Sequence, residues 1–136
     1  MPAANARTRL EEHFRAHPDG LVCAWLFGSV ARGTAGARSD VDVAVLLERA
    51  PAPTLAGLEG ELATAIERHL GARVDLVVAN RAPVDLVHRI LRDGVLVLDR
   101  LPLERARFEA RSRSAYFDLK PFLDRYRRVP GSTARG

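Results

Sequence analysis

The stretch of sequence that decides the fold is LVCAWLFGSVARGTAGARSDVDVAVLL, residues 21–47. It contains two continuous apolar runs, residues 21–27 and 41–47, separated by a glycine-rich segment. Continuous apolar runs of this length, bounded by turn-forming residues, are typical of strands that are buried on both faces. The segment between them, residues 28–38, predicts a loop that starts with a helical turn. The stretch therefore predicts two buried strands joined by a glycine-rich loop.

Outside this stretch, helical and strand patterns alternate along the chain. Apolar spacing and capping residues predict helices over residues 8–17, 54–70 and 83–93 and a long helix from residue 103. Shorter apolar runs predict strands over residues 73–78 and 95–98. Thr8 and Thr54 are predicted to cap the first two helices, and Pro121 to kink or split the last one. The alternation indicates an α/β fold with a sheet of about four strands, and it leaves open whether the sheet is parallel or mixed.

Length and composition indicate a single domain. The chain has 136 residues, of which 47% are apolar, as in an ordinary folded domain. The single cysteine, Cys23, excludes an internal disulfide and is interpreted as a small core residue. No apolar run is long enough to span a bilayer, and the N-terminus lacks the apolar segment of a secretory signal. We therefore expect a cytoplasmic protein with no membrane partner.

Positive charge is concentrated near the C-terminus. The net charge is +4, and residues 103–136 alone carry nine basic and four acidic side chains. We accordingly divide the domain into a catalytic core, residues 1–102, and a basic amphipathic helix with a frayed tail, residues 103–136. The charge suggests contact with nucleic acid or with an acidic protein surface, and a solvated helix face with Glu–Arg pairs is the alternative. The aromatic stripe from Phe108 to Tyr126 is interpreted as core or as a surface for homo-oligomer formation.

Three aspartates lie in the predicted strands. Asp40 and Asp42 are two positions apart, so both side chains are expected on one face, and Asp75 lies in the middle of the strand at 73–78. The three carboxylates converge if the two strands are neighbours. Carboxylates this close repel each other unless a cation compensates, and oxygen ligands suit Mg²⁺ or Mn²⁺. The set predicts a metal site for phosphoryl transfer in which Asp75 also accepts a proton, although Asp40 and Asp42 alone fit a strand end with two solvated acids.

The glycine-rich segment carries candidate nucleotide ligands. Gly28 and Ser29 follow a strand, where backbone N–H groups and a hydroxyl can bind phosphate oxygens. Arg32 lies one turn later and can add charge-assisted hydrogen bonds to the phosphates. Ser39 is predicted either to orient Asp40 or to cap the turn. The segment lacks the Gly-Lys-Ser/Thr of a Walker A loop and the G-x-G-x-x-G of a dinucleotide site, which excludes both of those binding modes.

The motif G-S-x-A-R-G at residues 28–33, with S-D-x-D at residues 39–42 and V-D-L at residues 74–76, resembles the signature of the DNA polymerase β-like nucleotidyltransferases. The likeness is to their minimal nucleotidyltransferase (MNT) branch and covers most of the chain. It implies a polymerase β-like palm, with a mixed sheet flanked by helices, that uses Mg²⁺ and ATP. The branch includes antitoxins paired with HEPN-domain RNase toxins, and some of these antitoxins adenylylate a tyrosine of the toxin.

The leading hypothesis is therefore a Mg²⁺-dependent adenylyltransferase that acts on a partner protein, a HEPN-domain toxin. The predicted core leaves little surface for binding a small acceptor, whereas a folded protein brings its own binding surface. One alternative is an antitoxin that neutralises its toxin by binding alone. Another is transfer to a small molecule or to RNA, for which the basic tail is the only indication. Among the remaining residues, His13 and His17 are interpreted as solvated helix residues and Tyr116 as a weak candidate for modification.

Overall fold

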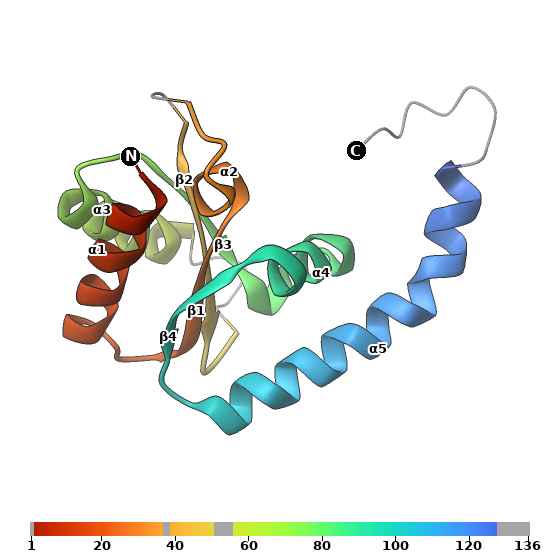
Figure 1. Ribbon diagram of the computed structural model, residues 1–136. Coiled ribbons are helices and arrows are strands. Elements are labelled where there is room, and N and C mark those ends of the chain that lie inside the picture. The colour runs from red at the N-terminus through yellow and green to blue at the C-terminus, as the bar shows by residue number, and fades with distance from the viewer. Residues whose placement is uncertain (1, 37–38, 51–55, 128–136) are drawn as a thin grey trace.

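The computed structural model describes residues 2–36, 39–50 and 56–127. The elements in chain order are α1 (Ala3–Ala16), β1 (Leu21–Phe27), α2 (Gly28–Arg32), β2 (Val41–Leu47), α3 (Ala56–Leu70), β3 (Val74–Val78), the 3₁₀ turn η1 (Ala79–Arg81), α4 (Val84–Asp93), β4 (Val95–Asp99) and α5 (Pro102–Arg127). Helices α1 and α3 cover one face of the sheet, and α4 and α5 lie on the other (Figure 1). The predicted α/β fold is confirmed.

The sheet is mixed, with the strand order β3-β2-β1-β4. β1 pairs antiparallel with both β2 and β4, whereas β2 pairs parallel with β3. Parallel neighbours need a crossover connection, and α3 lies in the connection between β2 and β3. The mixed sheet that the family resemblance implied is therefore confirmed, and it answers the question that the sequence pattern left open.

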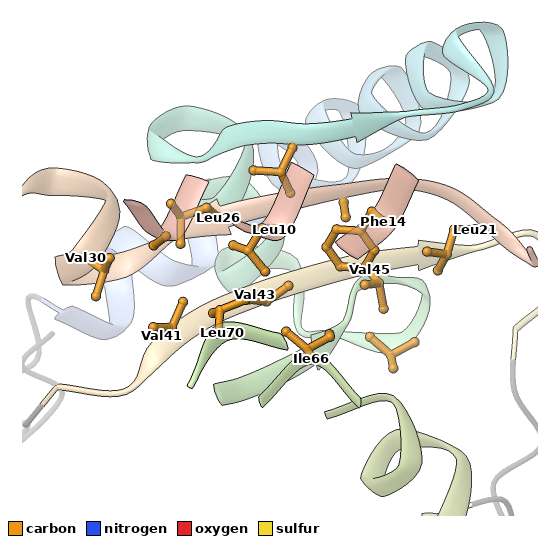
Figure 2. Close-up of a cluster of buried hydrophobic side chains, with 14 residues drawn as sticks. Leu10, Phe14, Leu21, Leu26, Val30, Val41, Val43, Val45, Ile66 and Leu70 are labelled. Carbon is orange, nitrogen blue, oxygen red and sulfur yellow. The ribbon is translucent and has the colours of Figure 1, made fainter. Parts of the chain in front are cut away.

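Apolar side chains form a core on each face of the sheet. Toward α1 and α3, Leu10, Ile66 and Leu70 pack with inward residues of β1 and β2 (Figure 2). Toward α4 and α5, Trp25 of β1 packs beside Phe108, with 6.2 Å between the ring centroids. Burial on both faces explains why β1 and β2 are continuous apolar runs rather than alternating ones.

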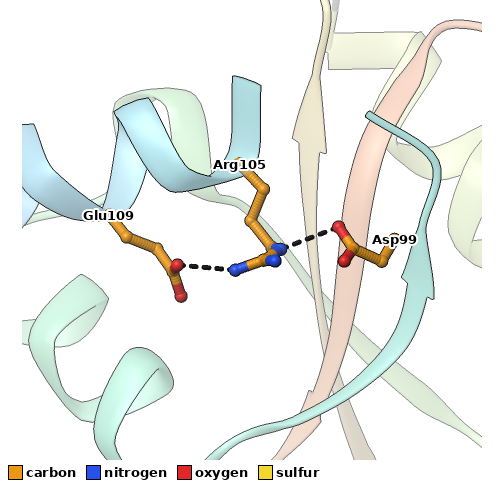
Figure 3. A network of polar contacts seen from close by, with 3 residues as sticks. All are labelled: Asp99, Arg105 and Glu109. Carbon is orange, nitrogen blue, oxygen red and sulfur yellow. Dashed lines mark hydrogen bonds and ion pairs between the residues drawn. The ribbon is translucent and has the colours of Figure 1, made fainter. Parts of the chain in front are cut away.

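An arginine fixes the start of α5 against the sheet. Arg105 Nε donates to Asp99 Oδ1 of β4 at 2.7 Å, and Arg105 Nη1 donates to Glu109 Oε1 at 2.6 Å (Figure 3). The side chain of Arg105 is only 21% exposed, so water screens these pairs less than it screens pairs on the open surface. The ion pairs and the buried ring of Phe108 together hold the first turns of α5 on the domain.

Beyond these turns α5 differs from its prediction. It continues as one helix through Pro121, so of the two effects predicted for this proline, a kink or a split, the split is wrong. The axis of the helix bends toward its C-terminal end (Figure 1). Pro121 is exposed, where water can solvate the carbonyl group that loses its helical partner. The aromatic stripe is buried only at its start, because Phe117, Phe122 and Tyr126 are 59–66% exposed. This half of the helix extends away from the sheet (Figure 1).

The first helix begins earlier than predicted, at Ala3 rather than at residue 8. Its N-cap residue is Pro2, and Thr8 lies inside the helix, so the predicted capping role of Thr8 is wrong. Alanine favours helix strongly but adds little to apolar periodicity, which is why Ala3 and Ala6 gave no clear signal in the sequence. Ala6 is nevertheless fully buried against the sheet.

His13 is buried, not solvated as predicted. Its residue exposure is 6%, and its ring lies 5.0 Å from the ring of His17 and 5.4 Å from that of His69. Burial lowers the pKa of His13 below the usual 6.5, and repulsion from the other two histidines adds to the effect. Periodicity could not reveal this, because His69 reaches His13 from α3.

The inward face of α4 is shifted by one residue from the prediction. Apolar spacing in the sequence predicts that Val84, Val87 and Leu91 face inward. Val87 is buried, but Ile90 takes the fully buried position in place of Leu91.

Two of the predicted features cannot be compared with the structure, because Thr54 and the tail, residues 128–136, lie outside the described residues. Within the described ranges, no helix combines the length and apolar content needed to cross a membrane.

Candidate active site

Strand pairing brings the predicted acidic and glycine-rich segments to one edge of the sheet. Asp42 lies near the start of β2, opposite Phe27 at the end of β1, and Gly28 follows Phe27 directly. On its other side, Asp42 lies opposite Asp75 of β3 in the parallel pairing. The condition attached to the sequence prediction, that the strands at 41–47 and 73–78 are neighbours, is therefore met.

Gly28 starts α2 in a conformation that only glycine adopts easily. Its φ is +74°, in the left-handed region, and a Cβ built on it would overlap the carboxylate of Asp42. The sequence predicts that backbone N–H groups at Gly28 and Ser29 bind phosphate oxygens. In the structure the group that approaches Gly28 is the Asp42 side chain, so this glycine makes room for a carboxylate beside Ser29.

Asp42 is the electrostatic centre of this edge. Burial raises the pKa of the Asp42 carboxyl above its usual value, and repulsion from Asp75 and Asp40 raises it further. Arg32 opposes the shift, and the protonated form donates a hydrogen bond to Asp75. Asp42 is half-buried, whereas Asp40 and Asp75 are exposed. The three carboxylates thus interact as a group, and the ionised form of Asp42 is disfavoured unless positive charge is added.

The remaining predicted residues lie in the loop before β2. Asp40 immediately precedes β2 rather than lying within it. The Ser39 hydroxyl accepts a hydrogen bond from Gly36 N at 3.0 Å, and Ser39 N donates to Gly36 O at 3.2 Å. Of the two roles predicted for Ser39, these bonds favour capping of the turn over orientation of Asp40.

A cavity of about 350 Å³ opens at this edge of the sheet. Its lining includes Gly28, Ser29, Arg32 and Asp42, so four of the predicted site residues surround one space. Asp40, Asp75 and Ser39 are not part of the lining, although Asp75 contacts Asp42 from the neighbouring strand. A cavity of this size that combines a hydroxyl, a guanidinium and a carboxylate is suited to a small polar ligand.

Helix α4 supplies a wall of the cavity that the sequence did not reveal. Leu86, Arg89 and Asp93 line it together with Phe27 at the end of β1. No motif marks these residues, because α4 reads as an ordinary amphipathic helix. They reach the site only because α4 packs beside α2 and β1 in the folded domain. The only available signal was their position on the side of α4 away from Val87.

The carboxylates suit a divalent cation in donor type. Among the residues that the structure describes, no three His, Cys, Asp or Glu side chains form a ready-made cage. Mg²⁺ is commonly held by one or two carboxylates, with water and substrate phosphates as the other ligands. The mutual repulsion that raises the pKa of Asp42 is the feature a cation would relieve. The residues therefore fit a metal that binds together with a phosphate substrate.

The arrangement supports charge-stabilised chemistry on a phosphate ester. Ser29 and Arg32 can donate hydrogen bonds to phosphate oxygens, and Asp42 with Asp75 can hold a cation beside them. Asp75 is exposed at the rim, where an incoming hydroxyl could reach it. These are the components that phosphoryl and nucleotidyl transfer require.

Comparison with known proteins agrees with this chemistry. Residues 9–102 match the family described as Polymerase beta, Nucleotidyltransferase. A solved structure described as a minimal nucleotidyltransferase is 34% identical, with a TM-score of 0.58 over 70% of this chain and 95% of that one. No curated protein matches the chain in a sequence search.

Two further solved structures share the fold over more of the chain. A toxin–antitoxin crystal structure with AMP-PNP is 23% identical, with a TM-score of 0.65 over 87% of this chain and 95% of that one. A complex of a tri-AMPylated Shewanella oneidensis HEPN toxin with an MNT antitoxin is 21% identical, with a TM-score of 0.66 over 90% of this chain and 96% of that one. At this level of identity they show a common fold.

Proposed function

The chain belongs to the polymerase β nucleotidyltransferase family, and from this premise we propose that it transfers AMP from ATP to a tyrosine hydroxyl of a HEPN-domain toxin. The observation that carries nucleotidyl transfer is the parallel register of Asp42 and Asp75 beside Gly28 and Ser29. The choice of acceptor is supported by the shared fold with the MNT antitoxin that was crystallised with a tri-AMPylated HEPN toxin. The chain would then be the antitoxin of such a pair.

In this proposal Asp40, Asp42 and Asp75 hold Mg²⁺ or Mn²⁺, which when bound offsets the negative charge of the triphosphate and of the transition state. Ser29 and Arg32 orient the phosphates by hydrogen bonding, which keeps the α-phosphorus beside the carboxylates. The carboxylate of Asp42 lies against Gly28 and interacts with Asp75, so it is close to the residues of α2 that would bind the phosphates.

The transfer itself is an in-line displacement. The tyrosine oxygen attacks the α-phosphorus of ATP, and the bond from that phosphorus to the oxygen bridging to the β-phosphate breaks. Pyrophosphate leaves with the charge that Arg32 and the Ser29 hydroxyl help to stabilise. The proton of the tyrosine passes to Asp75, whose exposure at the rim places it where a protein acceptor can approach.

The test is transfer of label from α-labelled ATP to a HEPN-domain protein from the same genome. We expect label on the HEPN protein in the presence of Mg²⁺, and its loss with Asp42→Asn, which keeps the size of the side chain. Asp19→Asn is a matched control, because Asp19 is exposed in the turn before β1, at the other end of the sheet. Label should persist in that variant.

Two results would overturn the proposal. If no label appears while wild type and Asp42→Asn bind the HEPN protein equally tightly, the chain neutralises by binding alone. If label appears on RNA or on a small molecule instead, the acceptor is not a protein.

A further inference from the structure

Arg89 is the second arginine that lines the cavity, beside Arg32. It projects from α4 into the space that Ser29, Arg32 and Asp42 line from the opposite elements. No hydrogen bond or ion pair links its guanidinium to another described residue, whereas Arg81, Arg92, Arg100 and Arg105 all have acidic partners. An exposed arginine without a partner is available to a ligand.

The acidic residue on the same wall does not neutralise Arg89. Asp93 is bound through both carboxylate oxygens by Arg92, with Nε to Oδ1 at 3.0 Å and Nη2 to Oδ2 at 2.9 Å. This two-bond pairing satisfies the carboxylate within α4 itself. Arg32 acts on Asp42 and Asp93 only through its charge and has no ion pair with a described residue. Arg32 and Arg89 are therefore the two arginines of the cavity whose guanidinium groups are not bonded to an acidic side chain in the described part of the chain.

Two guanidinium groups and a hydroxyl around one cavity define the ligand by its chemistry. A guanidinium is planar and donates two parallel hydrogen bonds to neighbouring oxygens of a phosphate or carboxylate. A single phosphate would be served by Ser29 and Arg32 alone. A second arginine on the facing helix suits a ligand that has several negative groups in a row.

We propose that Arg89 binds the β- and γ-phosphates of ATP from the α4 side of the cavity, facing Arg32, and holds the pyrophosphate as it leaves. The inference rests on the proposed function only in taking the ligand to be a nucleoside triphosphate. Arg89 is then a substrate-binding residue that discriminates triphosphate from monophosphate, and α4 becomes part of the nucleotide site.

The test compares two nucleotides that differ in their phosphates. Dissociation constants for AMP-PNP and for AMP are measured with Mg²⁺ by calorimetry on the full chain, for wild type, Arg89→Ala and Arg89→Lys. We expect Arg89→Ala to weaken AMP-PNP by about 10- to 100-fold, the usual effect of removing hydrogen bonds between charged groups, and AMP by about twofold or less. Arg89→Lys keeps the positive charge but cannot donate two parallel hydrogen bonds. Its affinity for AMP-PNP should therefore lie between those of wild type and Arg89→Ala.

Arg68→Ala is the matched control for the loss of one positive charge, because Arg68 is exposed on α3 and has no ion pair with a described residue. It should bind both nucleotides as wild type does. Equal losses for AMP-PNP and AMP in Arg89→Ala would mean that Arg89 contacts the base or ribose and would overturn the proposal. Unchanged affinity for AMP-PNP, or no binding of AMP-PNP by wild type, would overturn it too. Failure to label a HEPN protein, with this binding pattern intact, would count against the acceptor alone.

Discussion

Replacing Gly28 by alanine adds one methyl group where α2 meets the carboxylate of Asp42. The φ of +74° is unfavourable for alanine, and a left-handed conformation costs a residue with a Cβ about 1–2 kcal/mol. The new Cβ also overlaps the Asp42 carboxylate, and forcing an extra group into a packed site costs typically ~1–3 kcal/mol more. We therefore expect Gly28→Ala to lower the free energy of unfolding by about 2–5 kcal/mol, or roughly 8–20 °C in Tm for a chain of this length.

Gly71 provides the control that separates the two contributions. It follows α3 with a φ of +68°, and no atom lies within 4 Å of a Cβ built there. Gly71→Ala should therefore show the backbone contribution alone, about 1–2 kcal/mol or roughly 4–8 °C. The assay is reversible unfolding in denaturant, supported by thermal melts followed by circular dichroism, for both variants beside wild type.

A double-mutant cycle tests the physical cause. In an Asp42→Ala background most of the overlap disappears, so Gly28→Ala should then cost little more than Gly71→Ala does. The reasoning is refuted if Gly28→Ala and Gly71→Ala destabilise equally in the wild-type background. It is also refuted if the excess cost of Gly28→Ala survives in the Asp42→Ala background, because the carboxylate would then not be the group that the methyl meets.

Two further predictions concern pH. Because the folded-state pKa of Asp42 is raised, the folded chain holds this proton more tightly than the unfolded chain, and stability falls as the pH rises from about 3.8 through the raised value. Asp42→Asn should therefore stabilise the metal-free fold at pH 7 by roughly 0.5–2 kcal/mol, with the gain vanishing near pH 3.8; destabilisation at pH 7 would contradict it. The effect of His13 on stability has the opposite pH dependence. Its pKa is lowered in the folded chain, so the free energy of unfolding should fall as the pH drops below about 6.5. Between pH 7 and 5, the free energy of unfolding should therefore change less with pH in His13→Leu than in wild type.

The strands and the acidic motif were predictable because their signals are local. β1 and β2 coincide with the two apolar runs, since burial on both faces leaves no alternation to misread. The approach of Asp42 to Asp75 followed from each residue's place in its strand, once the two strands were assumed to be neighbours. Sequence alone could not show that β2 and β3 are neighbours. Their pairing depends on how α3, which connects them, packs on the face of the sheet.

The features that were missed depend on which elements meet in space. Arg89 has nothing in its local sequence that separates it from Arg92, the other arginine of α4. It becomes a cavity residue only through the packing of α4 beside α2. His13 is buried because His69 and α3 cover it. In both cases the apolar spacing predicted the helix, but it could not predict which other elements would contact these two side chains.

Charge repulsion at this edge of the sheet disfavours the ligand-free fold. Asp75 and Asp40 oppose ionisation of Asp42, and a cation shared by Asp42 and Asp75 would relieve that repulsion. The cavity has acidic and basic sides, with Asp42 on one and the exposed Arg32 on another, so it is complementary to a cation together with a polyphosphate. A ligand that joins Asp42 and Asp75 through a cation and binds Arg32 through phosphate uses both sides at once. Binding of nucleotide with metal should therefore stabilise this fold more than the separate effects of the two would suggest, because each supplies the charge that the other needs.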